Sequence, residues 1–362
     1  MKSRRGFIPM TKPVRVVVIG SGLVGSTYAY ALLLQDIADE ICLIDENSDK
    51  AIGQAMDLNH AMPMVNRTEI WAGDMDDVRD ADVVLIAAGV SQKPGETRMD
   101  LLKRNARVVG DIAQEIGEIA RKTIVLIATN PVDVMAYVAM VRSNLPPSRV
   151  MGLGTALDTA RLRYLTGREL SIDPRSVHAF VMGEHGDSEF VAWSRATIAG
   201  TGIQDWPDLR PDAQDRIESE VREAAYEVIS RKGATYYAPA VTLSRVTEAI
   251  VKDLRTVFSV SVYLEGQYGI YGVYLGAPAV VGKEGILRTI EIPLSEQELA
   301  RLQTSGRVIR QAITELELET HHYVPEIVGT AAFETSEELG RLEDSRRDRR
   351  HPRRPTKRPR PF

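Results

Sequence analysis

The sequence predicts an α/β protein in which a doubly wound parallel sheet is followed by an α+β domain. Over the first 150 residues, short apolar runs rich in Val and Ile alternate with stretches that suit helices. Repeated strand–helix–strand units of this kind build a parallel sheet with helices on both faces. After residue 200, long helical patterns precede hairpin-like segments, which is typical of an α+β arrangement.

Four strands are predicted in the first half, each a short apolar run. They cover residues 14–19, 40–44, 83–87 and 124–128. A strand that is buried on both faces is a nearly continuous apolar run, so these runs favour a parallel sheet. Residues 23–34 suit the helix that would follow the first strand.

The second half has a different pattern. Helices are predicted around 157–163 and at 212–229, 236–252 and 295–316, and strands at 256–264, 269–275 and 279–282. The predicted organisation is therefore a short leader over residues 1–12, a first domain over 13–152, a second domain over 153–318 and a tail over 319–362.

The composition is that of an ordinary globular protein, with 44% hydrophobic and 26% charged residues. The single cysteine, Cys42, rules out an internal disulfide, and its apolar neighbours favour a buried, inert thiol. No run approaches the roughly 20 apolar residues that cross a bilayer. The basic N-terminus lacks the apolar core of a signal peptide, and a second possible start lies at Met10. A cytoplasmic protein is expected.

Charge is distributed unevenly along the chain. Residues 341–362 carry a net charge of +7, so residues 1–340 carry −12. The Arg- and Pro-rich tail cannot bury apolar surface and is expected to be disordered. A passive, solvated tail is favoured over one that contacts nucleic acid, and the acidic body argues against nucleic-acid binding as its main role.

A glycine-rich turn follows the first predicted strand and opens the first predicted helix. In the dinucleotide-binding fingerprint of Rossmann domains, the first glycine allows a tight turn, the second admits the pyrophosphate and the third permits close packing. The N-terminus of the following helix attracts the phosphate charge. The predicted cofactor-binding residues here are Gly20, Gly22, Leu23, Val24 and Gly25.

Asp45 extends this prediction to the choice of cofactor. It lies 20 residues after Gly25, at the end of the second predicted strand, where a carboxylate accepts hydrogen bonds from the adenosine ribose. A carboxylate at this point repels a 2′-phosphate, so NAD is predicted rather than NADP. The alternative is a purely structural glycine turn.

His185 is the candidate for proton transfer. It lies in a tight loop after an apolar run, with Gly183 and Gly186 on either side, and these glycines would let a ligand approach its ring. Histidine exchanges a proton easily near neutral pH. A lone histidine of this kind is more often structural, so the prediction depends on its partners.

Further polar residues follow the third and fourth predicted strands, at the sheet edge where parallel sheets bind ligands. Residues 92–98 contain Gln92 and Arg98, and the glycines and proline around them favour a mobile lid. Asn130 and Pro131 follow the next strand. Taken alone, Arg98 could be a surface ion-pair partner.

Asp158 and Arg161 lie three residues apart in a predicted helix and therefore share one face. Such a pair could also be an ordinary surface ion pair or, for Asp158, a solvent-facing acid.

Taken together, these motifs resemble the L-lactate/malate dehydrogenase family over roughly residues 14–316. The resemblance implies reversible hydride transfer between NAD and a small 2-hydroxy acid, with no metal. It makes His185 the acid/base that exchanges a proton with the substrate, and Asp158 the residue that orients the imidazole. A catalytically silent NAD-binding scaffold is the competing interpretation, and the joint presence of these residues argues against it.

The resemblance also implies the substrate contacts. Arg161 would bind the substrate carboxylate with its planar guanidinium. Arg98, also catalytic, would polarise the reacting carbonyl, and Asn130 would contact both substrate and cofactor. The Asn130–Pro131 peptide is cis in the family.

Gln92 stands where malate dehydrogenases typically carry arginine. A neutral residue there would leave the second carboxylate of a dicarboxylate unpaired inside the closed site. Thr235 matches the lactate-type pocket wall, whereas Pro239 is closer to malate-type members. The resemblance therefore implies pyruvate and lactate as substrates, with malate or another 2-hydroxy acid as the alternative.

Arg163 and His178 stand where bacterial members that are activated by fructose 1,6-bisphosphate bind the activator across a subunit interface. Arg163 is two residues beyond Arg161, about 200° around the helix, so it points away from the substrate. The resemblance implies an activator site in a homotetramer. Ordinary surface or interface ion pairs are the alternative.

Overall fold

A computed structural model of the protein describes residues 12–65, 67–90, 95 and 97–316, without the side chain of Arg98. The predicted leader up to residue 11, with Met10, lies outside the described residues, as do Gln92 and the predicted tail over 319–362.

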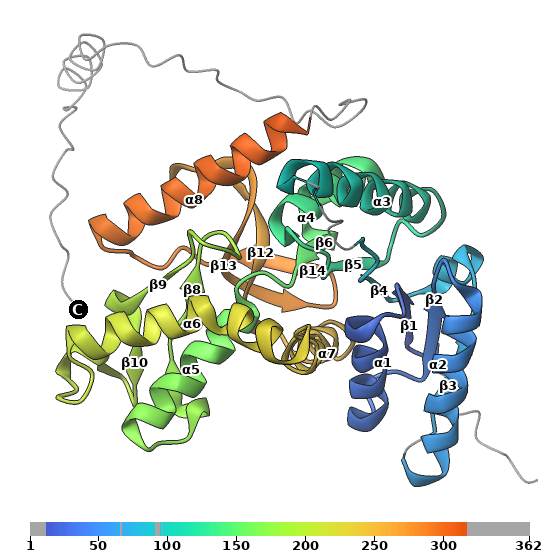
Figure 1. Ribbon diagram of the computed structural model, residues 1–362, viewed down its shortest axis with the longest axis horizontal. Helices are drawn as coiled ribbons and strands as arrows, with labels where there is room; N and C mark the ends of the chain where they lie inside the picture. The colour runs from blue at the N-terminus through green and yellow to red at the C-terminus, as the bar shows by residue number, and fades with distance from the viewer. Residues whose placement is uncertain (1–11, 66, 91–94, 96, 317–362) are drawn as a thin grey trace, which may run out of the picture. The chain divides into compact units, whose positions relative to one another are not determined.

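A nine-stranded sheet crosses the described part of the chain, in the order β14-β13-β12-β6-β5-β4-β1-β2-β3 (Figure 1). Six of its strands run parallel to one another, with β1 pairing with both β2 and β4. The parallel strands are β1 (Arg15–Ile19), β2 (Glu40–Ile44), β3 (Glu69–Ala72), β4 (Val83–Ile86), β5 (Ile124–Ile127) and β6 (Val150–Gly152). This order reverses direction at β1 and β4, as the doubly wound prediction requires.

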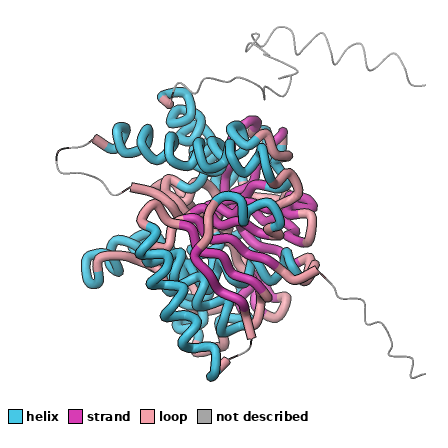
Figure 2. Tube along the Cα trace, turned by 90° about the vertical axis from the view of Figure 1, so that its right-hand side faces the viewer, coloured by secondary structure: helices cyan, strands magenta, loops and turns pink. Residues whose placement is uncertain are grey.

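Helices cover both faces of this parallel sheet (Figure 2). In the view of Figure 1, α3 and α4 lie above the strands and pack on each other, whereas α1 lies below and packs on α7. These helices are α1 (Leu23–Gln35), α2 (Ser48–Ala61), α3 (Arg98–Ile119), α4 (Val132–Ser143) and α7 (Tyr237–Val251). Because both faces are covered, the side chains of β4 and β5 are completely buried, which explains their continuous apolar runs.

The four predicted parallel strands are confirmed, and two further strands were not predicted. β6 is only three residues long, too short for an apolar run to stand out. β3 lies at the sheet edge, where only one of its four residues is buried.

The antiparallel strands of the second half extend the parallel sheet. They are β12 (Thr256–Glu265), β13 (Tyr271–Gly282) and β14 (Gly285–Thr289), and β12 pairs with β6. The prediction of separate strands at 269–275 and 279–282 was wrong, because β13 is continuous through Pro278. The Pro278 carbonyl accepts a hydrogen bond from the Ile290 N–H (2.7 Å). The proline nitrogen therefore faces the same edge of β13, just past the end of β14. No backbone donor is needed at that point, so β13 tolerates a proline there.

Most of the remaining elements lie around α5, whereas α8 packs on β13 and α4. The helices are α5 (Ala156–Leu170), α6 (Pro211–Lys232) and α8 (Glu296–Glu315), and the strands are β7 (Val177–His178), β8 (Val181–Met182), β9 (Phe190–Val191), β10 (Thr197–Ile198) and β11 (Thr201–Gly202). The predicted helices over 157–163, 212–229, 236–252 and 295–316 are confirmed, with ends that differ by a few residues. A second buried apolar cluster, which includes Leu162, Val181 and Ile217, fixes α5 against the short strands.

Cys42 is completely buried in β2, and burial raises the pKa of its thiol, as predicted for an inert cysteine. Among the described residues, no helix is both long and apolar enough to cross a membrane.

Candidate active site

The glycine-rich turn joins β1 to α1 and is shaped by backbone contacts. Gly20 has a φ of +101°, and a Cβ atom there would lie 2.5 Å from the backbone nitrogen of Ala88. A Cβ atom on Gly25 would lie 2.0 Å from the carbonyl oxygen of Gly20. Only glycine fits at these two positions, for the turn and packing reasons that the fingerprint predicts.

Gly22 leaves open space over the start of α1. The nearest atom to a Cβ there would be the Lys50 Nζ, 3.8 Å away. Gly22 is the N-cap of α1 and supplies no side-chain cap, and Leu23 and Val24 begin the helix. The first backbone N–H groups of α1 therefore lack a side-chain partner from the cap, which suits a pyrophosphate.

Asp45 follows β2 and faces this turn. Its Oδ2 accepts hydrogen bonds from the Ser21 N–H (2.8 Å) and hydroxyl (2.9 Å), and Lys50 Nζ lies 3.1 Å from it. Burial opposes the charge on Asp45, but bonds from Asn47, Lys50 and Ser21 outweigh burial and lower its pKa. Asp45 is therefore a stable carboxylate, and Lys50 is a contact that the sequence analysis missed.

A cavity of about 480 Å³ lies beside Asp45, between the strand ends and α3. It is lined by the glycine turn and by apolar side chains such as Val90 and Ile112. An open glycine turn, an ionised carboxylate and an adjoining cavity together fit the adenosine half of a dinucleotide.

His185 lies in the loop between β8 and β9. Gly183 anchors this loop to β13 by two backbone hydrogen bonds with Gly276, of 3.0 and 2.8 Å. Gly183 has a φ of +97°, and a Cβ atom there would lie 2.6 Å from the Ser305 Oγ. The expectation that Gly183 gives a ligand room was wrong, because Gly183 serves a left-handed turn and a close contact.

Asp133 of α4 holds the same loop from another side. Its Oδ2 accepts the backbone N–H of His185 (2.8 Å), and its Oδ1 accepts the hydroxyl of Ser261 in β12. Asp133 is almost completely buried, which raises its pKa to about 6 although both bonds oppose the rise. The sequence analysis missed Asp133, which lies three residues beyond the Asn130 that it singled out.

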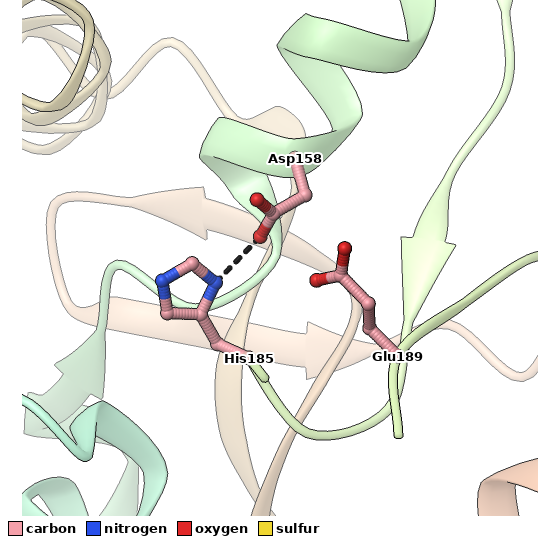
Figure 3. Close-up of side chains that lie close together, drawn as sticks. All are labelled: Asp158, His185 and Glu189. Atoms are coloured by element: carbon pink, nitrogen blue, oxygen red, sulfur yellow. Dashed lines mark hydrogen bonds and ion pairs between the residues drawn. The ribbon is translucent and has the colours of Figure 1, made fainter. Parts of the chain in front are cut away.

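Asp158 brings His185 and Arg161 together. The His185 Nδ1 lies 2.6 Å from Asp158 Oδ2 (Figure 3). An Arg161 N–H donates to Asp158 Oδ1 over 2.7 Å. Asp158 belongs to the first turn of α5, which explains why a residue three positions later on the same helix face reaches it. Because an ionised carboxylate can only accept, Nδ1 carries the proton, and Nε2 is left for a ligand.

The electrostatics of the trio favour an ionised Asp158 and a charged imidazole. Asp158 is 1% exposed, and burial raises its pKa, but His185 and Arg161 outweigh burial and lower it. Burial also opposes the charge on the imidazole, but Asp158 outweighs it and raises the pKa of His185 to about 9. The imidazole is therefore protonated at neutral pH.

Asn130 and Thr235 lie at element boundaries. Asn130 is exposed between β5 and α4, its carbonyl accepts from Asn105 Nδ2 (3.0 Å), and the predicted cis peptide to Pro131 is confirmed. Thr235 is half-buried just before α7. Pro239, the departure from the lactate-type pattern, is buried in the first turn of α7, where a helix tolerates proline.

Arg98 begins α3, but its side chain lies outside the described residues, as does Gln92. Thr97 is the N-cap of α3 and forms a capping box with Asp100, which fixes the start of the helix at Arg98, the last residue of the predicted lid.

Comparisons with known proteins agree with this geometry. Residues 14–152 match the model of the lactate/malate dehydrogenase NAD binding domain, and residues 155–320 match that of the lactate/malate dehydrogenase alpha/beta C-terminal domain. The chain belongs to the lactate/malate dehydrogenase family.

Relatives named L-lactate dehydrogenase resemble the chain over most of its length. The proteins of Thermoanaerobacter sp. (strain X514) and Priestia megaterium are each 46% identical over 84% of this chain, which covers 99% and 96% of their own length. A lactate dehydrogenase structure from a Medee basin deep-sea metagenome library is 43% identical with a TM-score of 0.83, over 85% of this chain and 100% of its own. The minor L-lactate dehydrogenase of Enterococcus mundtii, in a ligand-bound form, is 38% identical with a TM-score of 0.81, over 84% of this chain and 99% of its own.

Membership of the lactate/malate dehydrogenase family makes the protein an NAD-dependent oxidoreductase. The residues of the glycine turn and Asp45 fit NAD, as the open space at Gly22 and the adjoining cavity show. They would hold its pyrophosphate and adenosine ribose.

Arg163 of α5, which the helix geometry predicts to point away from the substrate contacts, binds the segment between β7 and β8. The Arg163 Nε donates to the carbonyl of Ala179 (3.3 Å), and its guanidinium lies over Phe180. His178 is exposed on β7, one residue before Ala179. Arg163 of α5 thus contacts the residue that follows His178 in the chain.

Asp158, His185 and Glu189 offer ligand atoms within 4.8 Å of one another, a separation that also suits a metal ion. A metal bound there would share Asp158 with Arg161, whose Nη1 lies 2.7 Å from Asp158 Oδ1. Two cations on one buried carboxylate repel strongly. Asp158, His185 and Glu189 are therefore better suited to proton transfer than to metal binding. The sequence analysis gave Glu189 no role, although it ends the histidine loop.

Proposed function

We propose that the protein is an L-lactate dehydrogenase that interconverts pyruvate and (S)-lactate with NAD, using a dinucleotide-binding domain over residues 13–152 and a catalytic domain over 153–318. The observation that carries this proposal is the buried Asp158, which binds His185 and Arg161 at once. It pairs a proton donor with a carboxylate-binding cation, and a 2-oxo acid needs both.

His185 would act as the acid in pyruvate reduction. Its protonated ring would donate from Nε2 to the carbonyl oxygen of the substrate, and Asp158 would stabilise the charged ring before that transfer. In lactate oxidation the neutral ring would accept the hydroxyl proton. The nicotinamide, when bound, supplies or accepts the hydride.

The other substrate contacts are proposed from the family resemblance. Arg161 has five N–H donors and uses one on Asp158, so its remaining donors could bind the substrate carboxylate. Arg98 would polarise the reacting carbonyl. Asn130 and Thr235 would complete the pocket.

The choice of lactate over malate or another 2-hydroxy acid rests on Gln92. The test compares kcat/KM for pyruvate and oxaloacetate in the unaltered protein and in a Gln92→Arg variant. We expect pyruvate to be preferred, and the variant to shift that preference toward oxaloacetate by at least about tenfold, since it supplies a partner for the second carboxylate. Faster reduction of oxaloacetate by the unaltered protein would instead identify a malate dehydrogenase.

We further infer that fructose 1,6-bisphosphate activates the enzyme through Arg163 and His178. Support comes from their shared position beside Ala179 and from the exposure of His178. The bisphosphate should lower the pyruvate concentration for half-maximal rate, and Arg163→Gln should abolish this effect. Arg168→Gln is the control, because Arg168 lies on the same helix but pairs with Glu220. An unchanged saturation curve with the bisphosphate would exclude activation.

A homotetramer is part of this proposal. Large apolar side chains are exposed on α1, α2 and α7, and a second copy of the chain could cover them. They include Leu34, Ile52, Met56 and Val241. Such patches on a protein surface often mark an interface. Sedimentation analysis of the full chain tests the tetramer, and a monomer at micromolar concentration would contradict it.

A further inference from the structure

Glu189 is a buried acid directly beside the proposed proton-transfer pair. It ends the histidine loop, and only 4% of it is exposed. One of its carboxyl oxygens lies within 4.8 Å of both an Asp158 oxygen and a His185 ring nitrogen. Figure 3 shows its carboxyl group turned toward Asp158. Two acids are thus enclosed within a few ångströms of each other.

The nearby cations are bonded to groups other than the Glu189 carboxylate. Arg161 and the charged ring of His185 are both bonded to Asp158. Arg301 of α8 donates to the backbone carbonyl of Glu189 and to the carboxylate of Glu218 in α6. Asp158 is therefore the better compensated of the two acids.

Asp133 of α4 is a further buried acid of this site, and it accepts the backbone N–H of His185. Two unscreened carboxylates in a buried site repel strongly, and in such pairs one acid keeps its proton.

We propose that Glu189 carries a proton at neutral pH and donates it in a hydrogen bond to Asp158, and is thereby a positioning residue that holds the Asp158 carboxylate against His185. Asp158 is the ionised member because it already accepts from His185 and Arg161. Burial and the charge of Asp158 raise the pKa of Glu189 to about 9, although His185 and Arg161 oppose the rise. The proposal rests on the proposed acid/base role of His185.

The first test measures the pH dependence of kcat/KM for pyruvate in Glu189→Gln and Glu189→Leu. Glutamine keeps a neutral hydrogen-bond donor at this position. In Glu189→Gln the pKa read from the alkaline side of the kcat/KM profile, which reports His185, should therefore stay within about 0.3 of its value in the unaltered protein. If Glu189 were ionised, its removal would lower that pKa by at least about 1, because a charge within 4.8 Å of the ring would be lost. Leucine removes the donor, and kcat/KM should fall about tenfold, the usual effect of losing one buried hydrogen bond.

The second test needs no turnover. Infrared spectra of the protein with ¹³C-labelled glutamate should contain the C=O stretch of a protonated carboxylic acid at pH 7. The band should shift in ²H₂O and be absent from Glu189→Gln. Absence of the band from the unaltered protein overturns the proposal, even if both variants fail to fold. Because the spectrum is independent of substrate, it separates this proposal from the lactate assignment.

Discussion

Replacing Asp158 with asparagine tests whether this carboxylate sets the charge of the imidazole. The pKa of His185 is raised to about 9 from an ordinary value of 6.5. Without the Asp158 charge it should fall by about 2.5, which corresponds to about 3.4 kcal/mol less stabilisation of the charged ring. Burial, which lowers this pKa, remains, and so does the smaller raising effect of Asp133. At about pH 7.5 the protonated fraction would then fall roughly tenfold, and pyruvate reduction with it.

The assay is the initial rate of NADH oxidation at low pyruvate across pH 6–10, since kcat/KM reports the free enzyme. Pyruvate reduction needs the protonated form of His185, so a lower pKa of His185 removes activity first at high pH. Asp158→Asn should therefore lose most activity above about pH 7 and least near pH 6. Asp173→Asn is the control, because Asp173 is an acid that pairs with Arg175 outside the site. A folded Asp158→Asn protein with its alkaline limb still near 9 would refute the reasoning.

Two further predictions concern the glycines and the cofactor. Gly183→Ala should lower the free energy of unfolding in urea by about 1–3 kcal/mol, because Gly183 has a left-handed φ and lies against Ser305. The control is Gly53→Ala in α2, where an added Cβ would have no atom within 4 Å; this variant should raise the free energy of unfolding by about 0.5–1 kcal/mol. Equal effects of the two substitutions would contradict the role of the Gly183 turn. Asp45→Ser removes the carboxylate but leaves Lys50 facing the ribose site. The ratio of the NADPH Kd to the NADH Kd, measured by fluorescence titration, should therefore fall by at least about tenfold, which is about 1.4 kcal/mol. An unaltered ratio would show that Asp45 does not select the cofactor.

Local patterns predicted much of the fold. The apolar runs of β1, β2, β4 and β5 are long because both faces of the sheet are covered, and this makes them visible in the sequence. β6 is equally buried but has three residues, and its place is set by pairing with β5 and β12. The predicted break between 275 and 279 does not occur, because β13 pairs with β12 without interruption through Pro278.

The site was only partly predictable. Asp158 and Arg161 share a helix turn, so their spacing predicts their contact. Asp158 and His185 are 27 residues apart, and only the family resemblance connected them before the structure placed them 2.6 Å apart. The protonation of Glu189 depends on burial and on neighbours from several elements, and neither can be deduced from its position in the chain.

The two hydrogen bonds between Gly183 and Gly276 connect the histidine loop to the main sheet. β13 carries Gly276 and belongs to the same sheet as β1, which leads into the glycine turn. Between β13 and β1 the strands with the fewest paired residues are β12 and β6, which pair at Ser261 and Gly152. The distance between the histidine loop and the cofactor turn therefore depends on this one pairing, and a substitution that disturbs it would act on both halves of the site at once.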